Sequence, residues 1–395
     1  SLMLLFAAGL FFRGAVKAAG LDPGFVPAGD LVTSIDFSLL KRDRAETRRL
    51  TLNIAQRARE LPGVTAVGVG TMLPYGNSTE ARRIASSRAT LSNDPKAPDP
   101  GVTALYTGIA PGYFEAIGVK ILRGRDFTQA ECEERNGRRL AIIDEEMAKK
   151  LFPNEDAVGQ HVRYTIQPKD GSSNDMEVIG VVGTHRHSVL NDAPLARLFV
   201  PFAQGYSGSV YLHLRYGKLA GQDRHALAGM IPTVRSFLRE IDPDIPILSM
   251  APFADLMEKS ADLWIVKLGA TLFGAFGLIA LLLAVVGVYG VKAYAVACRT
   301  REIGIRMALG ADRGDVVRMV MREASVLLVG GVIVGLVMAV AAAKTATTLL
   351  FGLQPGDPVT LAAAAAGLGM VAMLASYLPA LRASRLEPTE ALREE

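Results

Sequence analysis

The residues best suited to chemistry in this chain are few, and they form no recognisable catalytic set. His185 and His187 make an H-x-H pair after a predicted strand, but no carboxylate or cysteine lies at ligand spacing. A surface turn is therefore preferred over a metal site. The chain has no G-x-x-x-x-G-K-[ST] phosphate loop and no G-x-S-x-G nucleophile elbow. The sequence predicts no catalytic residue, no metal ligand and no cofactor on this chain, and it argues against an enzyme.

Basic residues concentrate in a second region, segment 292–323. They are Lys292, Arg299, Arg301, Arg306, Arg313, Arg318 and Arg322. We expect a short helix from about Arg301 to Leu309, ended by Gly310, and then a second helix capped by Asp312.

The short helix carries the residues that we expect to dock on a partner protein. They are Arg301, Glu302, Ile303, Gly304, Arg306, Met307 and Gly310. Ile303 and Met307 supply apolar contacts between charged neighbours, which suits insertion into a groove. A helix lying on the membrane surface is the alternative, although Gly304 is poor in such a helix and instead permits close approach of another backbone.

Composition indicates that part of the chain lies in lipid. Half of the residues are apolar and the mean hydropathy is +0.26, which is high for a soluble protein. The net charge of +4 is small for 395 residues and gives no indication of nucleic-acid binding. Cys132 and Cys298 fall on opposite sides of the predicted membrane, so we expect no disulfide between them.

Three runs have the roughly 20 apolar residues that a bilayer crossing needs. They are residues 268–291, 324–343 and 361–380, and none contains a charged residue. The opening run, residues 1–12, is about half as long and is interpreted as a truncated first span, which residues upstream of Ser1 would complete.

Orientation follows from the loops between the spans. Segment 292–323 is rich in Lys and Arg, whereas segment 344–360 has one basic residue, so the former is cytoplasmic by the positive-inside rule. The tail 381–395 is then cytoplasmic too, and residues 13–267 lie outside.

Strand and helix signals alternate within residues 13–267. Strands at 31–37 and 64–71 flank a helix that Asp43 caps, and strands at 209–216 and 245–250 flank a helix over 222–241. These two βαβ units predict a ferredoxin-like lobe, and about 105–202 would form an inserted second lobe. The expected fold is thus membrane α-helical, with four transmembrane helices of which the first is truncated, and with a large extracytoplasmic α+β domain of two lobes.

The spans contain small residues but no ionisable groups. Ala270 with Gly274, and Gly331 with Gly335, are spaced four residues apart, which lets helix backbones approach and would support helix packing or pairing of two copies. Because ion-coupled transport needs ionisable or broken-helix sites near the bilayer midplane, the energy for any transport has to come from elsewhere.

Four stretches together resemble FtsX-like permeases of the MacB class. The run R-T-R-E-I-G-I-R-M-A-L-G-A at 299–311 and the run L-P-A-L-R-A-S-R at 378–385 resemble the membrane part of that family. A-P-G-Y-F-E-A-I-G at 110–118 and R-G-R-D-F at 123–127 resemble its periplasmic core domain. The nearest kind is the duplicated permease that has no fused ATPase.

This resemblance implies a multi-pass permease subunit of an ABC transporter in the bacterial inner membrane. It would couple ATP hydrolysis by a separate cytoplasmic ATPase, which binds the ATP, to movement of the periplasmic domain for efflux or export, a mechanism called mechanotransmission. The short helix would be the coupling helix. A second permease protomer or repeat, a periplasmic adaptor and membrane lipid are the further partners expected. The alternative is an FtsX-like membrane regulator of a cell-envelope enzyme that transports nothing.

Overall fold

The computed structural model describes residues 1–76, 79–90, 100–135, 137–166, 174–188, 194–217, 224–345 and 357–385. Most of the predicted tail 381–395, most of the loop 344–360 and the start of the helix predicted over 222–241 lie outside the described residues. The chain separates into two compact units, which we call the helical unit (residues 1–20 and 264–395) and the sheet unit (residues 21–263).

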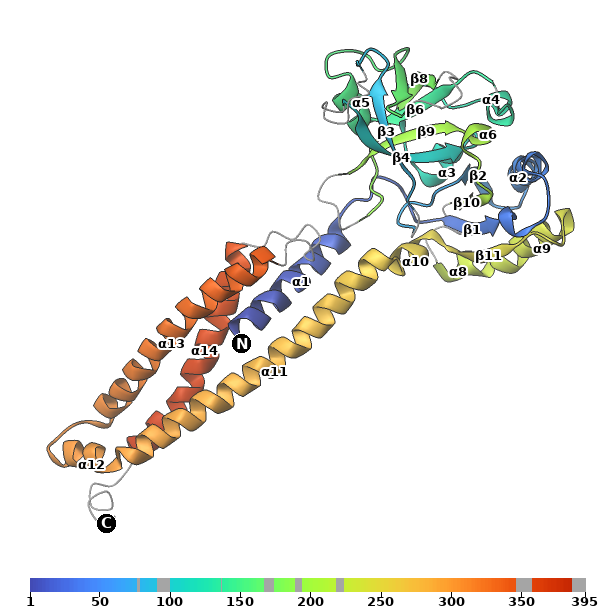
Figure 1. Ribbon diagram of the computed structural model, residues 1–395. Coiled ribbons are helices and arrows are strands. Elements are labelled where there is room, and N and C mark those ends of the chain that lie inside the picture. Colours follow the sequence, from blue (N-terminus) through green and yellow to red (C-terminus); the bar gives the residue numbers. More distant parts are fainter. Residues whose placement is uncertain are drawn as a thin grey trace. The chain divides into compact units, whose positions relative to one another are not determined.

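Long apolar helices and one short helix make up the helical unit (Figure 1). They are α1 (Leu2–Gly20), α11 (Ala261–Cys298), α12 (Thr300–Ala308), α13 (Arg313–Thr345) and α14 (Pro358–Ala383), α11 starting at the end of the sheet unit. By length and composition α11, α13 and α14 can each cross a membrane, whereas the apolar part of α1, Leu2–Val16, is shorter. Each helix extends past the apolar run predicted for it, because charged residues continue the helix at its ends.

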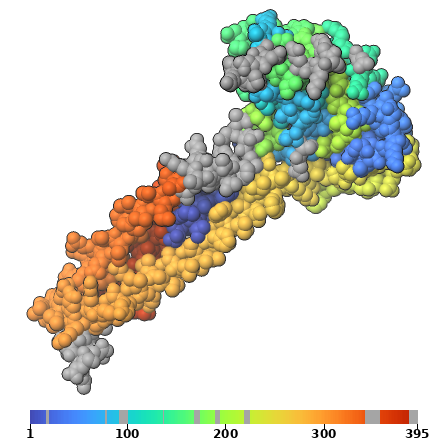
Figure 2. Space-filling view, viewed as in Figure 1, coloured from blue at the N-terminus to red at the C-terminus, as the bar shows by residue number. Residues whose placement is uncertain are grey.

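Helix α1 packs against the other three long helices, and in the space-filling view it lies between α11 and α13 (Figure 2). The rings of Phe11 and Phe273 stack at 4.8 Å. Gly277 allows this approach, since a Cβ there would lie 3.4 Å from Ala8. In the C-terminal half of α1, Arg13 forms an ion pair with Asp357, the residue that caps α14.

Four strands form the first part of the sheet unit, in the order β11-β1-β10-β2 with every neighbouring pair antiparallel. Their bounds are β1 Asp30–Asp36, β2 Val64–Gly70, β10 Ser209–Tyr216 and β11 Ile247–Pro252. Helix α2 (Arg44–Ala58) connects β1 to β2, and Asp43 caps it by accepting from the backbone N–H of Ala45. The helix predicted over 222–241 is instead two helices, α8 (Arg224–Gly229) and α9 (Ile231–Ile241), since Pro232 cannot continue the first one.

Six further strands close into a ring. The pairing runs β4-β3-β7-β8-β6-β9 and returns from β9 to β4, while β5 pairs with β8 outside the ring. Their bounds are β3 Ala81–Ser86, β4 Val102–Ile109, β5 Ile121–Gly124, β6 Leu140–Asp144, β7 His161–Tyr164, β8 Asp175–Val182 and β9 Ala196–Pro201. The predicted inserted lobe began at about 105, but β3 and the start of β4 also belong to the ring.

The two parts of the sheet unit share one continuous sheet and have separate cores. The sheet passes from β2 to β4 through the pair Gly70 and Ile109. Ile84, Ile143, Val178 and Leu198 belong to the core inside the ring, whereas the larger core lies against β1, β2 and β10. Short helices cover the rest: α3 (Tyr113–Ile117), α4 (Gln129–Glu133), α5 (Glu145–Leu151), α6 (Phe202–Gly205) and α10 (Phe253–Glu258).

An aromatic stack joins the two ends of the sheet unit. Phe25 precedes β1 and Phe253 opens α10, and their rings stack at 5.1 Å. Both residues are buried. The chain therefore enters and leaves the sheet unit at neighbouring points.

Candidate functional site

The candidate site is the elbow, which we define as residues 299–319, comprising α12 and the first turns of α13. Ile303 is 2% exposed and packs with Val316 of α13 and Ala383 of α14, while Met307 and Met319 lie at the edge of this small core. The apolar side of α12 thus faces its own chain. Ile303 and the buried Gly304, which we expected to contact a partner, hold the elbow together instead.

Gly310 ends α12 in the way its position predicts. Its φ is +100°, and the backbone N–H of Gly310 donates to Met307 O at 3.1 Å while that of Ala311 donates to Arg306 O at 3.0 Å. This pair of bonds is the Schellman motif. A Cβ at Gly310 would meet no atom within 4 Å, so the requirement for glycine here comes from the backbone conformation.

The outer face of the elbow is charged, and it also carries two exposed apolar residues. Glu302 accepts from Arg306 at 2.6 Å, an i,i+4 ion pair whose side chains are each half exposed, and Arg301 is exposed as well. Ile305 is 44% exposed and Leu309 is 83% exposed. These two lie four residues apart, one above the other on the helix surface. Our sequence-based site omitted both, although Leu309 stands directly before the glycine that ends the helix.

Polar contacts connect the elbow and the ends of the long helices next to it. Arg299 donates to Glu323 at 2.7 Å, and Lys292 Nζ lies 4.0 Å from the same carboxylate. Arg382 near the end of α14 donates to the hydroxyl of Tyr289 at 2.7 Å. Together with the packing of Ile303 on Ala383, these contacts connect the elbow to α13 and α14, and they connect α11 to both of those helices.

The four small residues predicted to pack helices have different surroundings. A Cβ at Gly335 would lie 2.8 Å from Leu2 of α1, so this glycine packs within the chain. Gly274 and Gly331 are exposed, with no described atom within 4 Å of a Cβ, and Ala270 is partly exposed. The contact between α11 and α1 is made by Gly277 and by Gly269, whose Cβ would lie 2.5 Å from Phe11. Sequence reasoning missed Gly269, although it shares one helix face with Phe273 and Gly277.

In the sheet unit, the segments 110–118 and 123–127 are bonded to each other. Asp126 accepts from the backbone N–H of Gly112 at 3.0 Å and from that of Phe127 at 2.8 Å. Gly112 has a φ of +86°, and a Cβ there would lie 2.9 Å from Val67 O. Burial raises the pKa of Asp126.

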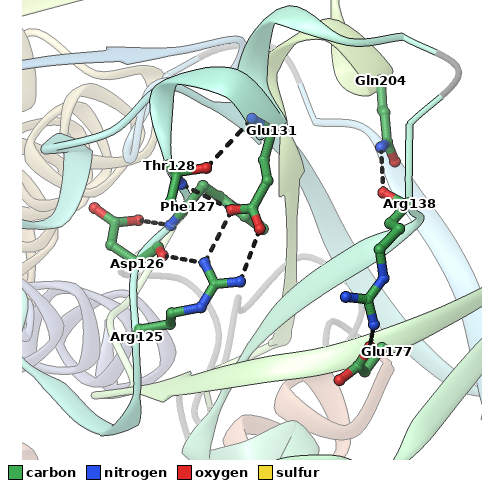
Figure 3. Close-up of polar contacts among 8 residues, drawn as sticks. All are labelled: Arg125, Asp126, Phe127, Thr128, Glu131, Arg138, Glu177 and Gln204. Atoms are coloured by element: carbon green, nitrogen blue, oxygen red, sulfur yellow. Dashed lines mark hydrogen bonds and ion pairs between the residues drawn. The ribbon is translucent and has the colours of Figure 1, made fainter.

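Next to Asp126, a short polar chain fixes the start of α4 (Figure 3). Arg125 donates to both oxygens of Glu131, at 2.9 and 2.7 Å, and Glu131 also completes a capping box with Thr128. The bond from Arg125 is the main reason that the pKa of Glu131 falls to about 2. Elsewhere, Arg138, which precedes β6, pairs with Glu177 of β8. These motif residues serve the architecture of the sheet unit.

The H-x-H pair is buried, so its interpretation as a surface turn was wrong. His185 is 1% and His187 is 7% exposed. They lie near Arg197, which is 1% exposed, donates through Nε to His185 O at 3.1 Å and donates its backbone N–H to Asp144 at 3.0 Å. Within the described ranges, no three His, Cys, Asp or Glu side chains gather as a metal site would require.

Burial shifts the pKa values of the two histidines and of Asp144. It lowers the pKa of His187 to about 4 and that of His185 well below its ordinary value, and in both cases the charge of Arg197 adds to the effect. Burial raises the pKa of Asp144 to about 6. Among the described residues, neither ring nitrogen of His187 has a hydrogen-bond partner. Both imidazoles are therefore neutral in the folded unit at neutral pH.

Two family models match the chain. The MacB-like periplasmic core domain matches residues 5–228, and the FtsX-like permease C-terminal domain matches residues 274–388. The macrolide export ATP-binding/permease protein MacB of Escherichia coli strain K12 is 28% identical over 306 residues, and so is MacB of Shigella flexneri. Each match covers 74% of this chain and 44% of the relative, so the chain aligns with less than half the length of these curated relatives.

Two solved structures align with part of this chain at low TM-scores. The periplasmic region of MacB from Actinobacillus actinomycetemcomitans gives a TM-score of 0.37 at 16% identity, covering 59% of this chain and 93% of that one. The extracellular domain of the transporter YknZ from Gram-positive bacteria gives 0.33 at 15% identity, covering 55% and 100%.

The helices and the domain matches agree on location and family. Among the described residues, three helices are long and apolar enough to span a membrane, and residues 5–228 match a periplasmic domain type. The chain is a multi-pass protein of the bacterial inner membrane, with its large domain in the periplasm. The match to the periplasmic core domain covers more than half of the chain, and the permease domain covers most of the rest. The chain therefore belongs to the MacB/FtsX-like family of ABC transporter permeases.

Proposed function

We propose that this chain is the permease subunit of an ABC transporter, in which a separate cytoplasmic ATPase drives the periplasmic domain for efflux or export. In this proposal the chain carries no catalytic residue and no cofactor, and ATP binds to the partner. The observation that carries the proposal is the elbow, a charged surface with two exposed apolar side chains built onto the ends of membrane helices.

The exposed residues of the elbow suit a protein partner. Leu309 and Ile305 are apolar anchors of the kind found at the centre of interfaces, and Arg301, Glu302 and Arg306 surround them with charge. Because Ile303 and Gly304 are buried in the elbow, the docking residues in our proposal are Arg301, Glu302, Ile305, Arg306 and Leu309. Ile303, Met307 and Gly310 keep this surface in shape.

The helical unit suits a role in transmitting force. We propose that α1 is the first of four spans and that its orientation follows the positive-inside rule, with the elbow in the cytoplasm. The salt bridge from Arg299 to Glu323 connects the elbow to α13, and the contacts of Lys292 with Glu323 and of Arg382 with Tyr289 connect α11 to α13 and α14. Of these, α11 leads directly from the sheet unit, so motion at the elbow has a continuous helical path to the periplasm.

We also propose a domain plan and a pairing mode. The order β11-β1-β10-β2 is that of two interleaved βαβ units, which supports a ferredoxin-like lobe. A Cβ at Gly274 or at Gly331 would meet no described atom within 4 Å, so we propose that these positions contact a second permease protomer or repeat. A periplasmic adaptor is a further proposed partner of the sheet unit.

The docking proposal is tested by Ile305→Glu and Leu309→Glu in the intact membrane protein. Both side chains are exposed, so the fold should tolerate the change. The copurifying ATPase is identified by mass spectrometry, and its binding is then measured with each variant. Since anchor residues at interfaces contribute about 2 kcal/mol or more, we expect at least a tenfold loss of binding and a matching loss of transport-coupled ATP hydrolysis.

The matched control is Leu39→Glu, which makes the same change at a leucine that is 63% exposed in the sheet unit. This variant should bind the ATPase normally. If Leu309→Glu and Leu39→Glu bind and stimulate the ATPase equally well, the elbow is not the docking site.

A further inference from the structure

One face of α13 carries two exposed arginines followed by two exposed apolar residues. Arg318 and Arg322 lie one turn apart and are exposed, and Val326 and Leu327 follow on the same face. Together with Asp315, Met319 and Glu323 they line a hollow of about 640 Å³. We call this set of residues the α13 face.

Arg318 and Arg322 are not neutralised by their neighbours. In the part of the chain that the structure describes, neither arginine has an ion-pair partner. The nearest carboxylate along the helix, Glu323, is held by Arg299 at 2.7 Å and approached by Lys292 at 4.0 Å. Arg306 also contacts Met319 of the α13 face and is paired with Glu302. The α13 face and its immediate neighbours thus carry five basic groups against the three carboxylates Glu302, Asp315 and Glu323, so the hollow attracts an anion.

The apolar part of the α13 face lies at membrane depth. Val326 is 68% and Leu327 is 65% exposed, and both belong to the apolar run predicted to span the bilayer, whereas Arg322 precedes it. A helix rises about 1.5 Å per residue, so Val326 lies about 6 Å deeper than Arg322. A soluble partner could reach the arginines but not these two residues.

We propose that the α13 face binds an anionic phospholipid of the cytoplasmic leaflet. The lipid phosphate lies between the guanidinium groups of Arg318 and Arg322, which bind phosphate by charge-assisted hydrogen bonds. One acyl chain lies along Val326 and Leu327. This site lies beside the elbow. A bound anionic lipid therefore changes the net charge next to the proposed ATPase-docking surface, and the lipid composition of the membrane determines how often the site is occupied.

The test uses a fluorescent reporter on the α13 face of the intact protein. The only tryptophan of the chain, Trp264, is replaced by phenylalanine, and Val326→Trp places a new one on the α13 face. The protein is reconstituted in phosphatidylcholine vesicles that contain brominated phosphatidylglycerol or, in parallel, brominated phosphatidylcholine. Stronger quenching by the brominated phosphatidylglycerol at equal mole fraction measures the preference for the anionic lipid.

Each arginine near a membrane surface favours an anionic lipid by about fivefold in binding constant. We therefore expect Arg318→Gln and Arg322→Gln each to reduce the preference about fivefold, and the double variant to abolish it. Arg313→Gln is the control, because Arg313 is exposed on the same helix but does not line the hollow.

Three outcomes would overturn the proposal. The first is equal quenching by the two brominated lipids, and the second is an equal effect of all three arginine variants. The third is loss of the preference on adding millimolar inorganic phosphate, which would mean that the site binds free phosphate and not a lipid. The measurement needs no ATPase, so its result is independent of the docking experiment at Leu309.

Discussion

Replacing His187 by leucine should make the sheet unit less sensitive to acid. In the folded protein His187 stays neutral down to a pKa of about 4, because it is buried beside Arg197. In the unfolded chain a histidine takes up its proton near pH 6.5. Between these two values the unfolded state binds more protons than the folded state, so stability falls as the pH falls through this window.

The size of the effect follows from the two pKa values. For His187 alone, lowering the pH from 7 to 5 should cost about 2 kcal/mol of unfolding free energy. His185 acts in the same direction. Asp144 acts in the opposite direction, because its pKa in the folded state is raised to about 6 and the folded state takes up the proton first. Between pH 7 and pH 5 this protonation adds about 1 kcal/mol to the unfolding free energy. Acid should therefore weaken the wild-type sheet unit, and His187→Leu should remove about 2 kcal/mol of that loss.

Cys132 provides an assay in the intact membrane protein. It is 0% exposed, and its thiol lies 3.4 Å from Ile109 O, so a reagent reaches it only when the sheet unit opens. With Cys298→Ser as background, the protein is equilibrated in urea at pH 7 and at pH 5 and then pulsed with a pyridyl disulfide, which reacts in acid. The urea midpoint at each pH gives the stability difference.

The control variant is Tyr75→Phe. Burial raises the pKa of Tyr75 above its ordinary value of 10, so its hydroxyl does not titrate between pH 5 and 7, although Tyr75 lies in the same cluster. This variant should show the wild-type difference between the two pH values. If His187→Leu shows that same difference, the buried histidine does not titrate as inferred and the reasoning is wrong.

Three further predictions concern other parts of the chain. Asp126→Ala leaves two backbone N–H groups without their acceptor and should destabilise the sheet unit by about 2 kcal/mol in the Cys132 assay; Asp156→Ala, at a carboxylate 61% exposed, should change it by less than about 0.5 kcal/mol. Gly269→Leu forces Phe11 of α1 away from α11 and should lower the unfolding free energy of the purified protein by about 1–3 kcal/mol, which is measured as a lower melting temperature. Gly274→Leu should leave the melting temperature of the single chain unchanged. In intact cells an impermeant maleimide should label Leu122→Cys, at a position 50% exposed, and leave Cys298, which our proposal places in the cytoplasm, unlabelled. Labelling of Cys298 would contradict the proposed orientation.

Local signals in the sequence predicted many individual elements. The Asp43 cap, the strand at 31–37 and the apolar runs of α11, α13 and α14 each follow from a few consecutive residues. The end of α12 at Gly310 was predictable for the same reason, since only a residue that tolerates positive φ fits there.

Properties that depend on distant partners were less predictable. His185 and His187 stand in a polar, turn-like sequence, yet both are buried, and His185 lies against the rings of Phe25 and Phe199 from other parts of the chain. Ile303 was expected to face a partner, but Val316 and Ala383 cover it. The strands β3 and β4 were missed, and with them the closing of the ring, because the pairing of β4 with β9 joins residues that are far apart in the sequence.

The stacking of Phe25 on Phe253 has a consequence for how such proteins can be built. Because the chain enters and leaves the sheet unit at neighbouring points, this unit has the form of an insertion between two helices of the membrane part. Domains whose ends lie close together tolerate transfer into another chain. The close ends of the sheet unit therefore give it the geometry of a single transferable module.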